Sequence, residues 1–248
     1  MSRKVRARMD GADGVVSVAV RLRVPAGAEV SSASVAIGSV ERAAILRESG
    51  GDLIVHATIR IADANLWWPH THGPQPLYDA LMRVTVAGSS VEFPIGRVAF
   101  RTIRLDTTGG GFALRVNDES VFSRGACWSP PDPLTLHCSR SEYRASLELA
   151  RDAGMNMLRV GGTMVYEHDD FYDLCDELGI MVWQDFMFAN MDYPEEDAAF
   201  AATVAEEAAQ QLERLAGRPS LAVLCGNSEG EQQAAMWGAG RERWSPKL

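Results

Sequence analysis

Long apolar runs and an excess of basic residues are both missing from this sequence. No run approaches the roughly 18 apolar residues that a membrane-spanning helix needs, and no apolar segment like that of a signal peptide follows the basic start. The 24 Lys and Arg stand against 33 Asp and Glu, a net charge of −9, whereas nucleic-acid binding depends on clustered basic residues. We therefore expect a cytoplasmic chain with no membrane and no nucleic-acid partner. The 46% apolar content excludes disorder as the main state.

Residues that form disulfides and metal sites are also scarce. The four cysteines lie far apart and include no CxxC pair, which favours buried free thiols. His70 and His72 have the spacing of two ligands on one strand face, but neighbouring prolines and a glycine indicate a solvated loop, and no third ligand accompanies them. We expect no metal and no organic cofactor.

Residues 1–105 alternate apolar and polar side chains, which is the period of strands with one buried face. The clearest runs are residues 16–22, 53–59 and 81–86. Segments rich in glycine, proline and serine separate the runs, as is typical of a small antiparallel sandwich. We predict an immunoglobulin-like β-sandwich over residues 1–105.

Residues 106–248 alternate short apolar runs with segments of helical period, the pattern of β/α units. The expected strands are residues 122–128, 155–160, 180–186 and 221–225. The capping-box pair Ser139 and Glu142 begins the first helix, Gly179 ends the second, and an apolar stripe from Phe200 through Leu215 marks the third. No glycine-rich phosphate-binding motif follows a strand, which favours a barrel over a dinucleotide-binding sheet. Since a complete (β/α)8 TIM barrel takes about 250 residues, we predict an incomplete barrel with about four β/α units over residues 106–248.

Polar residues follow the predicted strands, where a β/α barrel builds its active site. The candidates are Trp128, Arg159, Asp185, Asn227, Ser228 and Glu229. Arg159, Asp185 and Glu229 supply one cation and two carboxylates, a combination that holds sugar hydroxyls and transfers protons. The same charges also fit a purely structural ion-pair network at the barrel mouth.

Short motifs occur along the chain in a characteristic order. They are residues 66–69 (LWWP), 75–78 (QPLY), 100–103 (FRTI), 159–162 (RVGG) with 166–167 (YE), 171–180 (FYDLCDELGI), 182–189 (VWQDFMFA) and 225–229 (CGNSE). In order and spacing they resemble glycoside hydrolase family 2, and its β-mannosidase branch in particular. Proteins of this branch are longer, with another β-sandwich before these motifs and the second half of the barrel after them.

The resemblance implies a retaining exo-glycosidase that cleaves terminal β-D-mannosyl residues from β-linked oligosaccharides or glycosides by double displacement, without a cofactor. It makes Glu229 the catalytic acid/base. The substrate-binding residues that it implies are Arg159, Asp185, Asn227, Ser228 and Trp128. Ser228 stands where the family usually has an asparagine that reaches the sugar 2-hydroxyl. Trp183 is a further candidate for stacking on the sugar, with core packing as its alternative role.

The family's catalytic nucleophile lies on the seventh barrel strand, so we expect it beyond Leu248. Asp185 and Glu231 are candidate substitutes, and a carboxylate about 6.5–9.5 Å from Glu229 would instead give an inverting enzyme. Without the seventh strand we expect the isolated chain to be weakly active or inactive.

Two alternatives remain open. Another family 2 specificity, such as a galactosidase, glucuronidase or glucosaminidase, uses the same chemistry. A non-catalytic carbohydrate-binding fragment would bind sugar without hydrolysis. The open edges of half a barrel also predict association, either as a homodimer or with a complementing C-terminal fragment.

Overall fold

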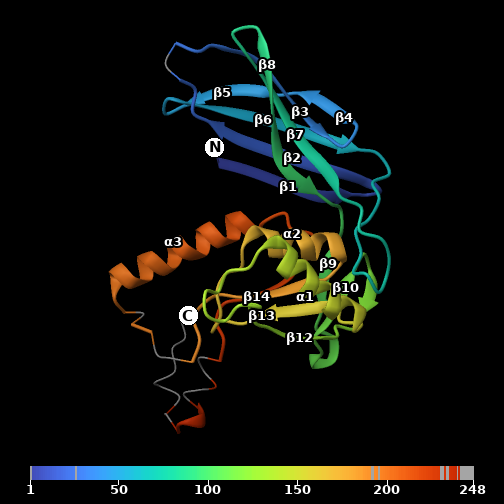
Figure 1. Ribbon diagram of the computed structural model, residues 1–248, viewed down its shortest axis with the longest axis vertical. Helices are drawn as coiled ribbons and strands as arrows, with labels where there is room; N and C mark the ends of the chain where they lie inside the picture. The colour runs from blue at the N-terminus through green and yellow to red at the C-terminus, as the bar shows by residue number, and fades with distance from the viewer. Residues whose placement is uncertain are drawn as a thin grey trace. The chain divides into compact units, whose positions relative to one another are not determined.

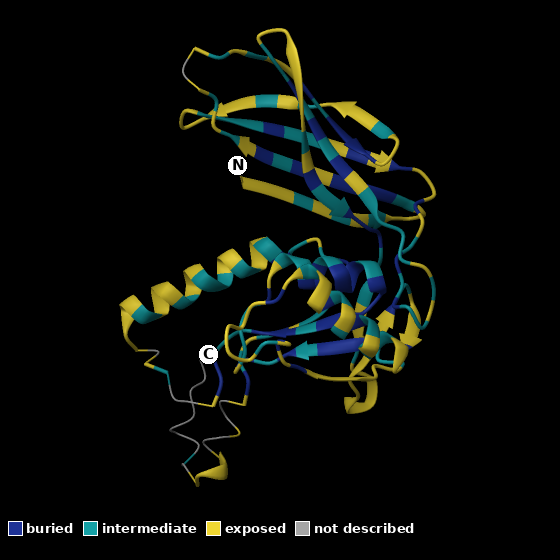
Figure 2. Cartoon of the chain, viewed as in Figure 1, coloured by how far each residue is buried: buried dark blue, intermediate teal, exposed yellow. Residues whose placement is uncertain are grey.

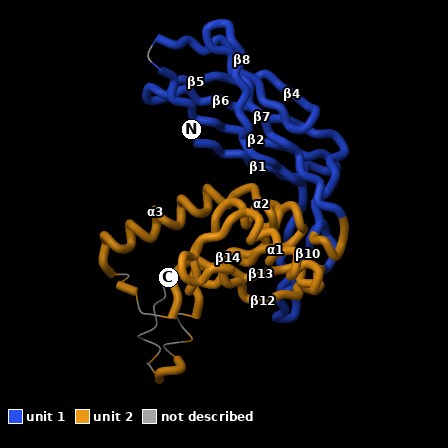
Figure 3. Tube along the Cα trace, in the orientation of Figure 1, with its two compact units in different colours: residues 1–68, 74–120 blue, residues 69–73, 121–248 orange. Residues whose placement is uncertain are grey.

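The computed structural model describes residues 2–25, 27–190, 193–194, 196–229, 232, 235–238 and 240. The chain forms two compact units: residues 1–68 and 74–120 are unit 1, and residues 69–73 and 121–248 are unit 2 (Figure 3). Strands make up most of the regular structure, with few helices. The compact units divide at residue 120, and the boundary predicted at residue 105 stays a prediction.

Unit 1 contains two four-stranded antiparallel sheets that share one hydrophobic core (Figure 1). One sheet has the order β1-β2-β6-β5 and the other β4-β3-β7-β8. The strands are β1 (Ser2–Asp10), β2 (Asp13–Leu22), β3 (Val30–Ile37), β4 (Val40–Ala43), β5 (Ile45–Ser49), β6 (Asp52–Ile61), β7 (Tyr78–Val86) and β8 (Ser89–Val98). Buried and exposed positions alternate along them (Figure 2), as in β2, where Val16, Val18 and Val20 enter the core. The three strands predicted from alternation are confirmed.

A smaller three-stranded sheet follows, with the order β11-β10-β9. Its elements are β9 (Ile103–Asp106), a 3-10 helix (Thr108–Gly110), β10 (Ala113–Val116) and β11 (Glu119–Val121). The Asn117 side chain accepts a hydrogen bond from the Thr102 backbone at 2.9 Å and donates one to the Trp67 carbonyl at 3.0 Å. These bonds tie the buried Trp67 of the LWWP motif to the strand connections of unit 1.

Unit 2 contains a parallel sheet with the order β12-β13-β14-β15, and one helix connects each successive pair. The elements are β12 (Gly125–Trp128), α1 (Arg140–Asp152), β13 (Met157–Val160), α2 (Asp169–Leu178), β14 (Met181–Asp185), α3 (Ala198–Leu215) and β15 (Leu221–Cys225). One face of the sheet and the apolar sides of α1 and α2 form a second core around Leu147, Val160, Leu174 and Val182. All four predicted strands and three predicted helices of this region are confirmed.

The sequence signals for helix ends match the structure. The Ser139 hydroxyl accepts from the Glu142 backbone, and the Glu142 carboxylate accepts from the Ser139 backbone at 2.7 Å, so the predicted capping box begins α1. Gly179 ends α2 with φ 70°, a left-handed conformation that glycine adopts without steric cost. In α3 the expected apolar stripe is only partly buried: Leu215 is in the core, whereas Leu212 is 43% exposed. Leu212 of the predicted stripe therefore lies outside the core.

Residues 69–73 form a loop that packs within unit 2. The His70 backbone donates to the Gly179 carbonyl, and its Nε2 lies 2.9 Å from the Met155 carbonyl oxygen. The Asn156 side chain donates to the Thr71 hydroxyl at 3.1 Å. Residues 70–72 form a turn, so the predicted loop is confirmed, but only His72 is exposed, whereas His70 is partly buried.

Candidate functional site

The face of the parallel sheet opposite the helices carries the polar candidates. Arg159 of β13 is in register with Trp183 of β14, and Asp185 lies two residues further along β14. Alternate residues of a strand point to opposite faces, so these three side chains share one face, while Val160 points into the core beneath the helices. Parallel strands end at the same edge of a sheet, and Ser228 follows β15 at that edge.

A buried carboxylate organises this face. Asp185 is 0% exposed, and its Oδ2 accepts hydrogen bonds from Arg159 Nη2 at 2.6 Å and Nε at 3.1 Å. Its Oδ1 accepts from Trp183 Nε1 at 2.8 Å. Arg159 Nη2 also donates to Ser228 Oγ at 3.0 Å. The structure therefore brings together three of the predicted site residues, Arg159, Asp185 and Ser228, and adds Trp183.

Arg159 keeps donors for a ligand. A guanidinium has five N–H donors, and Nη1 of Arg159 has no hydrogen-bond partner among the residues that the structure describes. The side chain is 31% exposed, so it is partly open to solvent. The hydrogen bond with Asp185 raises the pKa of Arg159 above its already high ordinary value, and the group stays cationic. This arrangement suits the binding of a hydroxyl or carboxylate oxygen.

The same geometry argues against Asp185 as a nucleophile. Both of its oxygens are engaged, and the side chain has no solvent exposure. Attack on an anomeric carbon needs an accessible carboxylate oxygen beside the sugar. Asp185 therefore orients Arg159 instead.

Ser228 and Glu229 form the tip that follows β15. The Ser228 backbone N–H donates to the Phe188 carbonyl at 2.8 Å, and the Ser228 carbonyl accepts from Asn190 at 3.2 Å. Ser228 also forms a parallel bridge with Ala189. The next residue, Glu229, has φ 65°, a left-handed conformation that costs a non-glycine residue about 1–2 kcal/mol. Strain of this kind concentrates at functional sites.

The Glu229 side chain is exposed, and its carboxylate has no hydrogen-bond partner in the described part of the chain. It follows a strand rather than lying on a helix, as the barrel pattern predicts. Its neighbour Asn227 is partly buried, and the Asn227 carbonyl accepts a hydrogen bond from the Cys225 thiol at 3.0 Å. The roles of Glu229 as acid/base and of Asn227 as a sugar-binding residue stay predictions.

Trp128 lies on the other face of the sheet. It is in register with Val160, it is 7% exposed, and its ring centroid lies 4.9 Å from that of Phe171 in the core beneath the helices. Its indole N–H donates to the buried Glu167 carboxylate at 2.7 Å, and Glu167 also accepts from the Tyr143 hydroxyl. Burial, with this hydrogen bond, raises the pKa of Tyr143 above its ordinary value. The structure does not bring Trp128 to the Arg159 face; the side chain predicted to face the sugar belongs to the core.

Trp183, for which the sequence leaves stacking and core packing open, lies beside Arg159 and Asp185. The Arg159 guanidinium lies 5.8 Å from the centroid of its ring. The signal available in the sequence was its position two residues before Asp185 on a strand, which places both side chains on one face.

The described residues contain no group of three or more His, Cys, Asp or Glu side chains that could hold a metal ion. All four cysteines are free; Cys138 and Cys175 are buried as predicted, but Cys127 is exposed. No helix in the described ranges has the length and apolar character to cross a membrane.

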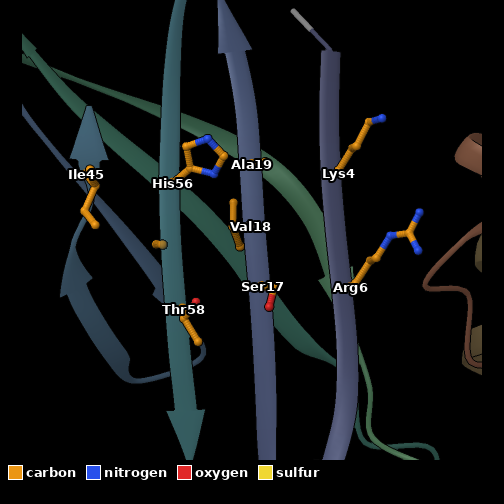
Figure 4. Close-up of a pocket in the computed structure, with 9 residues that line it drawn as sticks. Lys4, Arg6, Ser17, Val18, Ala19, Ile45, His56 and Thr58 are labelled. Atoms are coloured by element: carbon orange, nitrogen blue, oxygen red, sulfur yellow. The ribbon is translucent and has the colours of Figure 1, made fainter. Parts of the chain in front are cut away.

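Unit 1 contains a shallow groove of about 270 Å³ on the face of the β1-β2-β6-β5 sheet that points away from its core (Figure 4). Residues from all four strands of this sheet line it, including Lys4, Arg6, Ser17, Ile45 and His56. None of the predicted site residues belongs to this groove.

Comparison with known proteins identifies relatives of the chain. No family model matches the chain. The β-mannosidase of Capra hircus is 40% identical over 176 residues, which cover 68% of this chain and 20% of that protein. β-Mannosidase B of Aspergillus terreus is 36% identical over 185 residues, 73% of this chain and 22% of that protein. The chain thus spans about a fifth of the length of these curated relatives.

Solved structures agree with these relatives. The β-D-mannosidase of Dictyoglomus thermophilum matches 98% of this chain and 31% of its own, with a TM-score of 0.82 and 32% identity. The exo-chitosanase of Amycolatopsis orientalis matches 90% of this chain and 27% of its own, with a TM-score of 0.74; at 18% identity this likeness shows the fold alone. By these mannosidase matches, the chain is a β-mannosidase-like protein of glycoside hydrolase family 2.

Proposed function

We propose that the chain carries the acid/base part of a retaining exo-glycosidase that removes terminal β-D-mannosyl residues. The observation that carries the proposal is the convergence of Arg159, Asp185 and Ser228 at the ends of three adjacent parallel strands, directly beside the strained Glu229. The likeness to proteins named β-mannosidases supports mannose as the sugar.

In the proposed mechanism each group has one task. Glu229 protonates the leaving glycosidic oxygen and then accepts a proton from the water that hydrolyses the glycosyl intermediate. Arg159 and Ser228 bind sugar hydroxyls, and Asp185 holds the Arg159 guanidinium in place. Because Glu229 is exposed, a substrate that arrives from solvent can reach it.

A retaining mechanism needs a second carboxylate about 5–5.5 Å from the first. Asp185 is excluded by its burial and its three hydrogen bonds, and Glu231 lies outside the described residues. We assign the nucleophile to a part of the longer relatives that this chain does not span. It follows that the purified chain hydrolyses β-mannosides slowly or not at all, and that sugar binding is the property to measure first.

In the same proposal, unit 1 is an immunoglobulin-like sandwich and unit 2 is the first half of a TIM barrel. The two sheets around one core support the former, and four parallel strands in sequential order with connecting helices support the latter. The edges of such a half-barrel would pair with a complementing C-terminal fragment or with a second copy of the chain.

The test is a titration of the ¹⁵N-labelled 248-residue chain with 4-nitrophenyl β-D-mannoside, followed by NMR. We expect saturable shifts of the Arg159 Nε–H, the Trp183 indole N–H and the Ser228 amide. Asp185→Asn should weaken binding, because it removes the charge that orients Arg159. The control Asp152→Ala changes an exposed aspartate at the end of α1 and should bind like the wild type.

Absorbance of released nitrophenol measures turnover in the same samples. Robust turnover that Glu229→Gln abolishes would refute the assignment of the nucleophile outside this sequence. Absence of saturable shifts at the Arg159 face would contradict the sugar site itself. If the matching β-galactoside, β-glucuronide or β-glucosaminide binds more tightly than the mannoside, the chain has another family 2 specificity instead.

A non-catalytic role in carbohydrate binding is favoured by one observation. Among the described residues, no second accessible carboxylate is found on the Arg159 face of the sheet beside Glu229. If the chain binds the mannoside but remains inactive after a C-terminal fragment of a relative is added, this reading replaces the enzymatic one.

A further inference from the structure

We infer that Gly162 is a positioning residue for the Ser228–Glu229 tip. The inference rests on the proposed function in one respect, the role of Glu229 as proton donor. The structural part of the inference concerns three loops that meet at the carboxyl ends of β13, β14 and β15.

The three loops are joined by backbone hydrogen bonds. Phe186 after β14 donates to the Cys225 carbonyl of β15 at 2.9 Å. Further along the same two segments, Ser228 donates to the Phe188 carbonyl at 2.8 Å. The loop after β13 takes part through packing, and its contact residue is Gly162.

Gly162 leaves no room for a side chain. A Cβ built at this position would lie 2.7 Å from the Phe186 carbonyl oxygen and 2.9 Å from the Ser228 Cβ. It would also lie 3.4 Å from the Ala189 Cβ, the residue that bridges Ser228. The absent side chain at Gly162 therefore allows all three loops to approach one another at the point where Ser228 sits.

Ser228 is consequently held on four sides. Its N–H and carbonyl bond to the loop after β14, its hydroxyl accepts from Arg159, and its Cβ packs against Gly162. Glu229 follows directly in a left-handed conformation, which persists only where the surroundings determine it strongly. Gly162 thus fixes the direction in which the Glu229 side chain leaves the tip.

The neighbouring glycine provides a matched control. A Cβ built on Gly161 meets no atom within 4 Å. Gly162→Ala has to displace Ser228 by about half an ångström to reach ordinary contact distances, whereas Gly161→Ala displaces nothing. Functional groups need placement within about 0.5 Å, so this displacement is large enough to change the site.

The experiment compares the wild type, Gly161→Ala and Gly162→Ala in the full chain. The Glu229 carboxyl ¹³C signal, assigned as the signal missing from Glu229→Gln, reports the surroundings of the carboxylate. We expect Gly162→Ala to shift this signal and the Ser228 and Asn190 amides, and to raise the Kd for 4-nitrophenyl β-D-mannoside about tenfold or more. Gly161→Ala should leave all of these unchanged.

Two outcomes overturn the inference. One is a Gly162→Ala protein whose Glu229 and Ser228 signals match those of the wild type. The other needs no variant: the wild type should show NOEs between the Gly162 Hα and Ser228 Hβ protons, and their absence contradicts the packing even if Gly162→Ala does not fold. If the wild type fails to bind the mannoside, the proposed function fails, while the carboxyl signal and the NOEs still decide the role of Gly162.

Discussion

The left-handed backbone of Glu229 makes a quantitative prediction about stability. Glu229 has φ 65°, its side chain is exposed, and no hydrogen bond of its carboxylate exists among the described residues. Replacing it with glycine removes a conformational cost of about 1–2 kcal/mol without breaking a described contact. Glycine also raises the entropy of the unfolded chain, which opposes the gain by about 0.4–1 kcal/mol. We expect Glu229→Gly to increase the free energy of unfolding of unit 2 by about 0.5–1 kcal/mol.

Glu229→Ala is the matched control, because alanine keeps the left-handed cost and loses only an exposed side chain. Its free energy of unfolding should stay within about 0.5 kcal/mol of the wild type. Urea unfolding should be followed through NMR signals of core methyl groups in unit 2, such as those of Leu147 and Val160, because two compact units need not unfold together. If Glu229→Gly is no more stable than Glu229→Ala, the strain argument fails.

Two further predictions concern unit 2. Ser139→Ala should lower its free energy of unfolding by about 1 kcal/mol through loss of the capping box, and Ser139→Gly by only a few tenths, as urea unfolding would show; equal losses would contradict the capping argument. Burial raises the pKa of Tyr166 from 10.0 to about 12, so its contribution to stability is complete below pH 10 and is lost as the pH rises toward 12. In Tyr166→Phe the free energy of unfolding should therefore fall less between pH 10 and pH 12 than in the wild type. An equal fall in both proteins would contradict the burial of Tyr166.

Much of the fold was predictable because its signals are local. The capping box at Ser139, the glycine end of α2 at Gly179 and the apolar strand Leu221–Cys225 each depend on a few neighbouring residues. The first parallel strand was predicted to start at Phe122 but begins at Gly125. Phe122 is 79% exposed, and the strand starts where a glycine permits the Met157 carbonyl to approach closely.

The location of the candidate site along the chain was predictable, but the face of the sheet to which each side chain points was not. The run that ends at Trp128 has no regular alternation of apolar and polar residues, so the sequence does not show which of its side chains point toward the helices. Register with Val160 decides this and places Trp128 in the core. The close approach at Gly162 and the backbone strain at Glu229 are also products of tertiary structure, although the residues themselves were marked by the motifs. The cytoplasmic location stays a prediction.

In unit 2, the ion pairs that stabilise the fold and the residues of the candidate site lie on opposite faces of the parallel sheet. On the helix side, Arg218 forms ion pairs with Asp169 and Asp176, and its guanidinium lies 6.0 Å from the Tyr172 ring centroid, so its donors are used within the fold. On the opposite face, Arg159 is held by a buried carboxylate yet keeps Nη1 without a partner in the described residues. A sheet selected for stability alone would gain by replacing such a pair with apolar side chains and by placing glycine at Glu229. The Arg159–Asp185 pair and the left-handed Glu229 both lie at one edge of one sheet. Ligand binding at that edge would account for both, and this gives a physical reason to look for the sugar there.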